Sequence, residues 1–362
     1  MSTAVIKLGS NIVARDDGEP RMSVLGHVCE EAVELQRQGH HVVLVTSGAI
    51  ALSIGAMELP VRPTEMSELQ AASAVGQGKL YRLYDELLAS HGARSAQVLL
   101  TFPDLSARRQ YLNARRTLRT LLQWGVIPVI NENDTVATDE ISFGDNDFLA
   151  AQVAILVDAD VLLLLTNTEG LYTRDPHEDG AQLIHEVTDF AEIRDLEIGE
   201  STSSLGSGGM RSKVVAAEMA TAAGIPTTIV NGIRPGAIVR AMAGEDEGTR
   251  FRASDRPIAS FKLWLKYAKP ARGRLVVDAG AAGALRERGT SLLPVGVVEV
   301  EGDFHAGDAV HVQANGGPIG KGIVNYSADE LRRVKGLKSD ELREVMPRGS
   351  EEAVHRDYFV LE

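Results

Sequence analysis

The sequence is poor in cysteine, in aromatic residues and in the short motifs that mark metal and nucleotide sites. Cys29 is the single cysteine, so no disulfide can form within the chain, and we expect a reducing compartment. The nine histidines form no HExxH pair and there is no CxxC, so no zinc site is predicted. The two tryptophans, Trp124 and Trp264, form no stacking platform, and the GxxxxGKS/T motif of a P-loop is absent.

Positive charge is also scarce. The chain has 37 Lys or Arg against 50 Asp or Glu, a net charge of −13, and its pI is near 5.2. This negative net charge argues against a main role in binding nucleic acid or an anionic membrane, although a local cluster of donors can still bind an anionic substrate. Asp158 and Asp160 interrupt the most apolar stretch well before membrane length, and we expect no secretory leader. We therefore expect a soluble, cytoplasmic protein.

The first two thirds of the chain alternate short apolar runs with longer amphipathic ones. Apolar strands that are separated by helices predict an α/β fold with a mostly parallel sheet sandwiched by helices. Ligands bind such sheets at the carboxyl ends of the strands, so the residues that follow each strand are the candidates for function. The predicted strands cover residues 4–8, 41–45, 97–100, 126–130, 161–165 and 227–230, and the predicted helices include 23–39, 107–123, 148–157 and 209–223.

The pattern changes after about residue 250, where the helical periodicity stops. Short apolar runs with Gly-rich turns then predict a small β-rich domain, with strands at 275–277, 296–300, 309–312 and 318–324. The polar segment before it suits a linker. At 362 residues the chain has room for two domains, which we place at 1–250 and 272–362 with a linker at 251–271.

Two lysines are candidates for binding an anion. Lys7 lies inside an apolar strand, and burying its ammonium is expensive without an anionic partner. The alternative is a lysine at the end of the strand whose ammonium reaches water. Lys213 follows a Gly-rich loop that opens a predicted helix, where backbone N–H groups and the helix dipole favour a phosphate. Taken alone, that loop is interpreted equally well as a flexible segment with a solvated lysine.

Acidic and amide residues gather in the polar stretch between residues 131 and 147. Crowded carboxylates repel one another unless cations hold them. They can pair with a ligand ammonium or orient the two lysines, and we favour such roles for Asp134 and Asp147. The alternative is a solvated acidic loop with helix capping by Asp145 or Asn146.

Small polar residues follow two further strands. Ser47 lies two residues after the strand at 41–45. Small residues at this place can offer backbone N–H donors to a carboxylate, although an ordinary strand-to-helix turn would look the same. Thr166 and Asn167 follow the strand at 161–165 and are placed to touch a nucleotide base or ribose.

Five longer motifs make the pattern specific. They are VTSGAI (45–50), PVINEND (128–134), FGDND (143–147), LLLLTNTEGLYTRDP (162–176) and GSGGMRSK (206–213). In this order they resemble the amino acid kinase family, and within it the glutamate-phosphorylating members that carry a C-terminal PUA domain. The second domain resembles a PUA domain through RGRLVVDAGA (272–281) and FHAGDAVHV (304–312). The resemblance covers nearly the whole chain and implies an amino acid kinase-like fold followed by a small PUA-like barrel.

The resemblance implies transfer of the γ-phosphoryl group of ATP to the side-chain carboxylate of L-glutamate, the first step of proline biosynthesis. It implies that Lys7 and Lys213 neutralise the transferring group and that Asp147 organises them. Glutamate-binding positions are matched by Ser47, Asp134 and Asn146, with Asp134 suited to the substrate ammonium. Nucleotide-binding positions are matched by Thr166, Asn167, Ser207, Gly208, Gly209, Met210, Arg211, Ser212 and Lys213. The family more often has an acidic residue at the place of Asn167.

The residue types fit this chemistry. A glutamate side chain has a pKa of about 4.3, so it is already ionised at neutral pH and needs no general base. Catalysis is then positioning and charge neutralisation of a largely dissociative transition state. Mg²⁺ would be held mainly by the ATP phosphates, with few protein ligands. The family resemblance also implies proline as a feedback inhibitor and a homo-oligomeric state.

Two alternatives stay open. A related kinase acting on acetylglutamate, aspartate or carbamate would share the phosphoryl machinery, but an acetylated substrate has no ammonium for Asp134, and aspartate kinases carry different regulatory domains. The other alternative is RNA binding by the PUA-like domain. Residues 271–362 hold 12 Lys or Arg and 15 Asp or Glu, a net of −3, which disfavours a phosphate-gripping surface. This domain has one local basic cluster, made of Arg332, Arg333, Lys335 and Lys338. Acidic residues flank the cluster on both sides.

Overall fold

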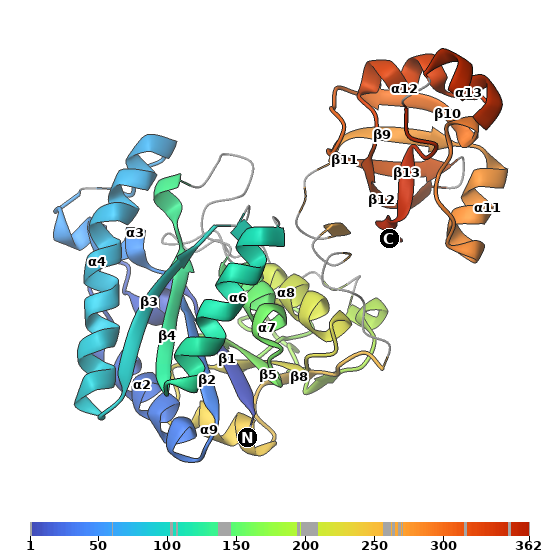
Figure 1. The fold of residues 1–362 in the computed structure, drawn as a ribbon. Helices are drawn as coiled ribbons and strands as arrows, with labels where there is room; N and C mark the ends of the chain where they lie inside the picture. The colour runs from blue at the N-terminus through green and yellow to red at the C-terminus, as the bar shows by residue number, and fades with distance from the viewer. Residues whose placement is uncertain are drawn as a thin grey trace. The chain divides into compact units, whose positions relative to one another are not determined.

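The computed structural model of the chain forms two compact units, Met1–Pro257 and Ile258–Glu362 (Figure 1). The division falls inside the predicted linker, 251–271. The structure describes residues 2–59, 61–101, 104–105, 108–136, 146–193, 196, 209–255, 262, 265–266, 269, 271–314, 317–346 and 349–361.

An eight-stranded sheet organises the first unit, in the order β3-β4-β2-β1-β5-β7-β8-β6. The six strands from β3 to β7 run parallel, while β8 is antiparallel to β7 and parallel to β6. All six predicted strands are confirmed, and the two short ones, β6 and β8, were not predicted. Their bounds are β1 (Thr3–Leu8), β2 (His41–Thr46), β3 (Arg94–Leu100), β4 (Val126–Glu132), β5 (Val161–Thr166), β6 (Glu186–Val187), β7 (Thr227–Asn231) and β8 (Thr249–Phe251).

Helices cover both faces of this sheet. Figure 1 shows α6, α7 and α8 on one face, with α2, α4 and α9 on the other, as expected for a parallel sheet buried on both sides. The long helix α4 was not predicted. The helical elements of this unit are α1 (Ser10–Val13), α2 (Met22–Arg37), α3 (Ala49–Ala56), α4 (Met66–Ser90), α6 (Arg108–Gln123), η1 (Asp134–Val136), α7 (Asn146–Val157), η2 (Phe190–Ile193), α8 (Met210–Ala222) and α9 (Ala237–Ala243).

The alternation of side chains along β1 separates the core from the functional face. Ile6 and Leu8 belong to one large apolar cluster, together with alternate residues of the neighbouring strands and the buried faces of α2 and α4. Successive side chains of a strand point to opposite faces, so Lys7 lies on the other face, the one that α7 covers. β1 is central in the sheet, which explains why this lysine is buried.

The lone cysteine is part of that core. Cys29 lies on α2 and is fully buried in the same apolar cluster. Burial raises the pKa of its thiol to about 12. Cys29 therefore serves as a small apolar core residue.

The second unit contains a five-stranded sheet in the order β10-β9-β11-β12-β13. Neighbours pair antiparallel except β9 and β11, which are parallel. Four of these strands were predicted and β13 was not, because charged residues occupy its exposed middle. The strands are β9 (Ala271–Val277), β10 (Val297–Gly302), β11 (Ala309–Ala314), β12 (Gly317–Val324) and β13 (Val354–Leu361).

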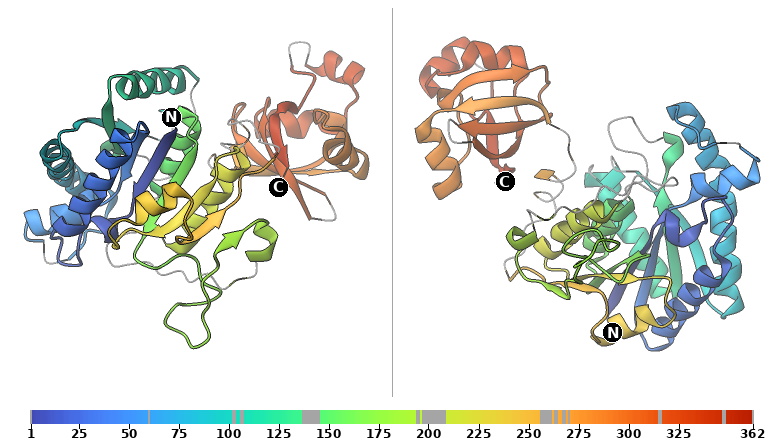
Figure 2. Two further views of the ribbon diagram at one scale, coloured as in Figure 1. Left: turned by 90° about the horizontal axis from the view of Figure 1, so that it is seen from below. Right: turned by 180° about the vertical axis from the view of Figure 1, so that it is seen from behind.

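The predicted barrel is not closed in the part of this unit that the structure describes. β10 and β13 are the two edges of the sheet, and a single bridge from Leu292 to Val354 joins the segment before β10 to β13. The expectation that helices end near residue 250 was wrong. Among the residues described after β9, three helices flank the sheet, and Figure 2 shows two of them, α12 and α13, lying together at one end. The helical elements are α11 (Ala279–Arg288), η3 (Pro294–Gly296), α12 (Ala328–Val334) and α13 (Ser339–Val345).

Part of the predicted linker packs on the second unit. Leu265 is fully buried against Ala309 and Val360. The ammonium of Lys321, in β12, donates a hydrogen bond of 3.2 Å to the carbonyl of Lys266. A buried leucine is unusual for a solvated linker, so this stretch is part of the small domain's core. No helix among the described residues is long and apolar enough to cross a membrane.

Candidate active site

A buried carboxylate lies between two buried lysines at the carboxyl edge of the large sheet. Asp147 Oδ1 is 2.6 Å from Lys7 Nζ, and Asp147 Oδ2 is 3.1 Å from Lys213 Nζ. Ser212 Oγ donates to Oδ2 at 2.6 Å. All three charged side chains are buried, so the structure brings together the three residues predicted to be catalytic.

Three elements that are distant in sequence position this cluster. β1 carries Lys7 between β2 and β5, in register with Val45 and Leu164. Asp147 is in the first turn of α7, and Lys213 is in the first turn of α8. Because α7 packs against both β1 and α8, the three side chains converge beneath the start of the two helices.

Two ammonium groups contact one carboxylate in this cluster. Burial raises the pKa of Asp147, but the charges of Lys213 and Lys7 and the hydrogen bonds outweigh it and hold that pKa well below its usual range. Asp147 is therefore ionised throughout the neutral range. Buried ammonium groups form charge-assisted hydrogen bonds with anions, and a phosphoryl group is such an anion.

A second cluster, of amides and hydroxyls, lies next to the first. Asn146 Nδ2 contacts the Thr46 carbonyl at 2.8 Å, Asn131 Oδ1 at 2.8 Å and Ser47 Oγ at 3.1 Å. Asn131 in turn donates from Nδ2 to Gln77 Oε1 at 2.6 Å. Asn146 Oδ1 is buried and has no hydrogen-bond partner among the described residues. A buried acceptor without a donor is costly, so Asn146 Oδ1 is a candidate acceptor for a bound molecule.

Gly48 explains how Ser47 enters this cluster. The chain turns sharply from β2 into α3 at Gly48, whose φ of +102° lies in the left-handed region. A Cβ at this position would also meet Val13 Cγ1 at 2.9 Å. Only glycine fits both conditions, and the turn leaves Ser47 at the carboxyl end of β2, beside Asn146.

Asp134 lies at the start of η1 and is nearly as buried as Asp147, but it has a different partner. Its Oδ2 accepts a hydrogen bond of 2.5 Å from Ser73 Oγ. Burial raises the pKa of Asp134, and the Ser73 hydrogen bond only partly opposes that effect. No lysine or arginine is recorded within ion-pair distance of this carboxylate in the described part of the chain.

The predicted nucleotide-binding residues fall on two elements. Thr166 ends β5 and is buried, while Asn167 follows it and is exposed. The N-terminus of α8 begins after Gly209, which has extended backbone and no side-chain cap. Ser207 and Gly208 lie outside the described residues. At the helix start, Met210 is half-buried, Arg211 is exposed, and Ser212 and Lys213 turn toward Asp147.

The sequence analysis assigned no role to the residues that support the second cluster. Asn131 begins the polar stretch at 131–147 that the sequence singled out, but it was not chosen as a site residue. Ser73 and Gln77 lie on α4, which was not predicted. Their spacing of four residues is a signal of a shared helix face, but it is informative only once the helix is recognised.

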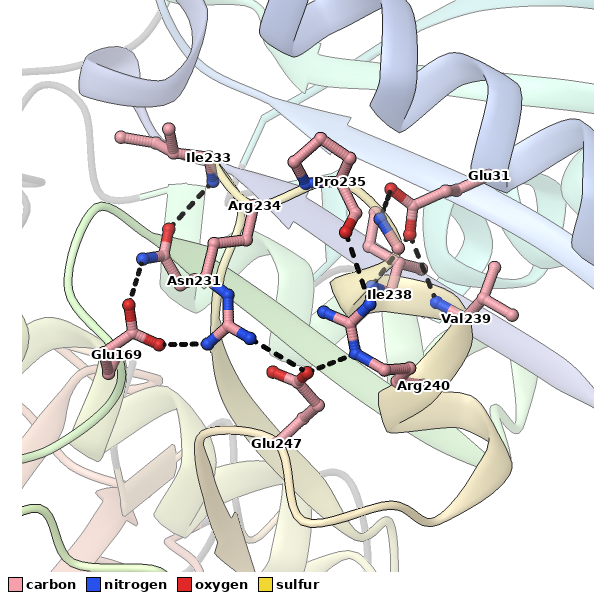
Figure 3. A network of polar contacts seen from close by, with 11 residues as sticks. Glu31, Glu169, Asn231, Ile233, Arg234, Pro235, Ile238, Val239, Arg240 and Glu247 are labelled. Atoms are coloured by element: carbon pink, nitrogen blue, oxygen red, sulfur yellow. Dashed lines mark hydrogen bonds and ion pairs between the residues drawn. The ribbon is translucent and has the colours of Figure 1, made fainter.

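A third polar network joins the loops that follow β5 and β7 (Figure 3). Asn231 donates to Glu169 at 2.8 Å and Arg234 donates to the same carboxylate at 2.6 Å. Burial raises the pKa of Glu169, but these two hydrogen bonds outweigh it, so the pKa lies below its ordinary value. Glu247 contacts both Arg234 and Arg240. The network fixes the Glu169 loop, which continues from the predicted nucleotide-binding residues.

Nearby, Glu31 of α2 holds the first turn of α9 (Figure 3). Its buried carboxylate accepts backbone N–H groups of Gly236, Ile238 and Val239 at 2.8, 2.9 and 3.2 Å. The contact ties two helices of the same layer together.

Comparison with known proteins identifies the families to which the two parts of the chain are similar. The model of the amino acid kinase family matches residues 2–231, which is more than half of the chain. The chain belongs to the amino acid kinase family. The model of the PUA domain matches residues 273–346. Both parts of the family resemblance seen in the sequence are therefore confirmed.

Curated relatives match along almost the full length. A glutamate 5-kinase of Synechococcus sp. (strain JA-3-3Ab) is 46% identical over 99% of this chain and 98% of its own. The glutamate 5-kinases of Meiothermus ruber and Chromohalobacter salexigens are 44% and 46% identical, each over 99% of this chain and 95% of its own. A UMP kinase structure from Bacillus anthracis is 18% identical with a TM-score of 0.49, covering 69% of this chain and 96% of that one.

Proposed function

We propose that this chain transfers the γ-phosphoryl group of ATP to the side-chain carboxylate of L-glutamate, which gives L-glutamyl 5-phosphate, the first intermediate on the way to proline. The observation that carries the proposal is the pair of adjacent clusters at one sheet edge. One is a buried Lys7–Asp147–Lys213 group suited to a phosphoryl group. The other is a polar pocket wall suited to an amino acid. The full-length relatives named glutamate 5-kinase support this assignment.

In this proposal the two lysines neutralise the charge of the transferring group. The glutamate side chain is already ionised at neutral pH, with a pKa of about 4.3, so no residue needs to remove a proton. Lys7 and Lys213 approach from different elements, and Asp147 holds both ammonium groups in place. Preorganised charges of this kind stabilise a transition state without reorganising as the reaction proceeds.

Asp134, Asn146 and Ser47 are proposed to bind the glutamate. Asp134 is a buried carboxylate whose pKa is raised by burial, so a cation beside it would stabilise its charged form. The substrate ammonium supplies that cation. Asn146 Oδ1, which lacks a donor among the described residues, accepts a hydrogen bond from the same ammonium. Ser47 contacts Asn146 and completes the wall of the pocket.

ATP is proposed to lie along the start of α8 and the end of β5. Backbone N–H groups at a helix N-terminus favour phosphates, and Gly209 leaves them unobstructed by a cap. Thr166 and Asn167 are proposed to contact the nucleoside. No group of three His, Cys, Asp or Glu in the described part of the chain is placed to hold a metal ion. The donors next to the phosphates are cationic, so Mg²⁺ would be held by ATP itself, where it neutralises phosphate charge.

Three further points are extensions of this proposal. Proline, which has an α-ammonium and a carboxylate like those of glutamate, would compete for the same pocket. We also propose a homo-oligomer and a cytoplasmic location. RNA binding by the PUA domain is not favoured, because residues 271–362 carry a net charge of −3.

The test is turnover of ATP with L-glutamate, with the acyl phosphate trapped by hydroxylamine as the hydroxamate. We expect hydroxamate that depends on L-glutamate and is absent with N-acetylglutamate or aspartate. Turnover with N-acetylglutamate instead would preserve the phosphoryl cluster but contradict the role of Asp134. Folded protein that turns over none of these substrates would contradict the proposed reaction as a whole.

A further inference from the structure

One face of α4 is directed at the proposed glutamate pocket. Ser73, Gly76, Gln77, Leu80 and Tyr84 follow one another at helical spacing, and all but the half-buried Gln77 are buried. The opposite face of the same helix is exposed. Leu80 and Tyr84 anchor the face in the apolar core.

The polar members of this face each bond a different segment of the pocket. Ser73 Oγ donates to Asp134 in η1 at 2.5 Å. Gln77 Oε1 accepts from Asn131, at the end of β4, at 2.6 Å. The Tyr84 hydroxyl is 2.8 Å from Thr46 Oγ1, at the end of β2.

The same helix lies in backbone contact with the start of α3. A Cβ on Gly76 would be 1.7 Å from the carbonyl oxygen of Ala49, which no side chain could tolerate without displacing the helix. Ala49 follows Gly48 in the turn that presents Ser47. The depth of α4 is therefore fixed relative to the turn after β2.

These contacts leave the pocket residues with defined orientations. Asn131 donates to Gln77, so its Oδ1 is free to accept from Asn146 Nδ2, and this directs Asn146 Oδ1 away from Asn131. On the other side, the Ser73 hydroxyl occupies Oδ2 of Asp134. Oδ1 of Asp134 has no recorded partner in the described part of the chain, so it is the oxygen left for the ammonium.

We propose that α4 is the element that positions the substrate-binding side chains, and that Ser73 is the positioning residue that orients the Asp134 carboxylate toward the substrate ammonium. This inference rests on the proposed function, since it assigns Ser73 a role through Asp134. Ser73 itself need not touch the substrate. A hydrogen bond to a charged carboxylate is stronger than a bond between neutral groups, so the Ser73 hydroxyl holds the Asp134 side chain in one orientation.

The first test compares Ser73→Ala and Ser73→Thr with the parent in steady-state kinetics. Loss of the hydroxyl is expected to raise KM for glutamate about tenfold, which is the scale of a hydrogen bond to a charged group. kcat and KM for ATP should stay within about twofold, because the phosphoryl cluster is untouched. Ser73→Thr keeps a hydroxyl and is expected to restore most of the glutamate KM. Ser67→Ala, at an exposed serine of the same helix, is the matched control and should change nothing.

A binding measurement keeps the test independent of turnover. Calorimetric titration of L-glutamate should show the same loss of affinity in Ser73→Ala, and alanine in a helix interior leaves the fold intact. In an Asp134→Asn background, Ser73→Ala should cause little further loss, since the group that it positions is gone.

The outcomes separate the two proposals. A parent protein that forms no hydroxamate from glutamate sinks the proposed function. An active parent in which Ser73→Ala binds glutamate normally overturns the role of Ser73 alone. The role of Ser73 would also be overturned if the KM for glutamate and the KM for ATP both rose and kcat fell by similar factors. Such a uniform change indicates a general packing defect. Additive losses in the Asp134→Asn background would show that Ser73 acts by another route.

Discussion

Asp147 and Asp134 are two buried carboxylates of one site, with exposed fractions of 0% and 9%, yet their pKa values move in opposite directions. Burial raises the pKa of both. Around Asp147 two ammonium groups outweigh that effect, whereas the partner of Asp134 in the described part of the chain is the Ser73 hydroxyl. The partner, and not the depth of burial, decides the direction.

The contrast indicates how the work of the site is divided. In the proposed function the phosphoryl end is the Lys7–Asp147–Lys213 cluster, whose charged groups already contact one another. The substrate end has a carboxylate whose charge is not yet compensated, and the missing cation comes with the proposed substrate. Environments that push two carboxyl groups apart in pKa are a common way of giving them different roles.

Asp147→Asn should have the largest effect on this contrast. It leaves two buried ammonium groups without their shared counter-ion, so the free energy of unfolding is expected to fall by about 3–5 kcal/mol. Glutamate-dependent hydroxamate formation should fall below detection. Denaturant unfolding and the hydroxamate assay measure the two effects. A variant as stable and active as the parent would contradict the cluster.

Lys213→Ala should separate catalysis from stability. Asp147 keeps Lys7 as a partner, so the fold is expected to survive, while kcat falls about a hundredfold or more because one neutralising charge is lost. Steady-state kinetics and thermal unfolding provide the two readouts. Lys79→Ala, at an exposed lysine on α4, is the control and should match the parent. Near-normal turnover in Lys213→Ala would remove Lys213 from the reaction.

The third prediction concerns pH and the Asp134 end. An ordinary aspartate has a pKa of about 3.9. Because the pKa of Asp134 is raised by burial, this carboxylate takes up a proton at a higher pH than that. A protonated Asp134 cannot pair with an ammonium, so the glutamate KM should begin to rise above the pH range in which ordinary aspartates titrate. Asp147 stays ionised over the same range, so the KM for ATP should not follow.

Asp134→Asn is the reference for that pH profile. Its glutamate KM is expected to be about tenfold or more above that of the parent near neutral pH, the scale of a lost charge-assisted contact. The additional rise at lower pH should be absent, because no carboxyl group remains to titrate at this position. If the variant keeps the same pH dependence, a different group, such as the substrate's own carboxylate, is responsible.

The smallest effect is expected at Glu31. This is a third buried carboxylate, and its charge is stabilised in a different way from those of Asp147 and Asp134. Its oxygens accept three backbone N–H groups at the start of α9, so no cation is required (Figure 3). Glu31→Gln keeps one good acceptor and should lower stability by about 1 kcal/mol, with kinetic constants unchanged. Thermal unfolding and the hydroxamate assay check this. A large loss of activity would link this helix contact to the site.

The parts of the molecule that could be predicted from the sequence follow the parallel sheet. Buried parallel strands appear as continuous apolar runs, so β1, β2, β4 and β5 were recognisable, and residues after them were found by one rule. That rule favoured Asp134, whereas Lys7 was recognised as a charge inside an apolar strand and Asp147 as part of a crowded polar stretch. The positions of Ser207 and Gly208 are outside the described residues, and their role remains a prediction.

The parts that were missed depend on contacts between distant segments. The buried face of α4 contains Ser73 and Gly76 in place of large apolar residues, so its helical periodicity is weak. The pairing of Ser73 with Asp134 spans 61 residues and has no local signal. In the second unit, the Ser327–Glu330 capping box of α12 was a sequence signal for a helix, and the prediction of a β-rich domain overlooked it.

Cys29 gives the chain a practical property. Its side chain is fully buried, and at a pKa of about 12 only a negligible fraction is thiolate at pH 7 to 8. Maleimide reagents act on accessible thiolates, so the unmodified protein should present almost no background. A cysteine introduced on any exposed surface would then carry a fluorophore or spin label alone, without prior removal of the native one.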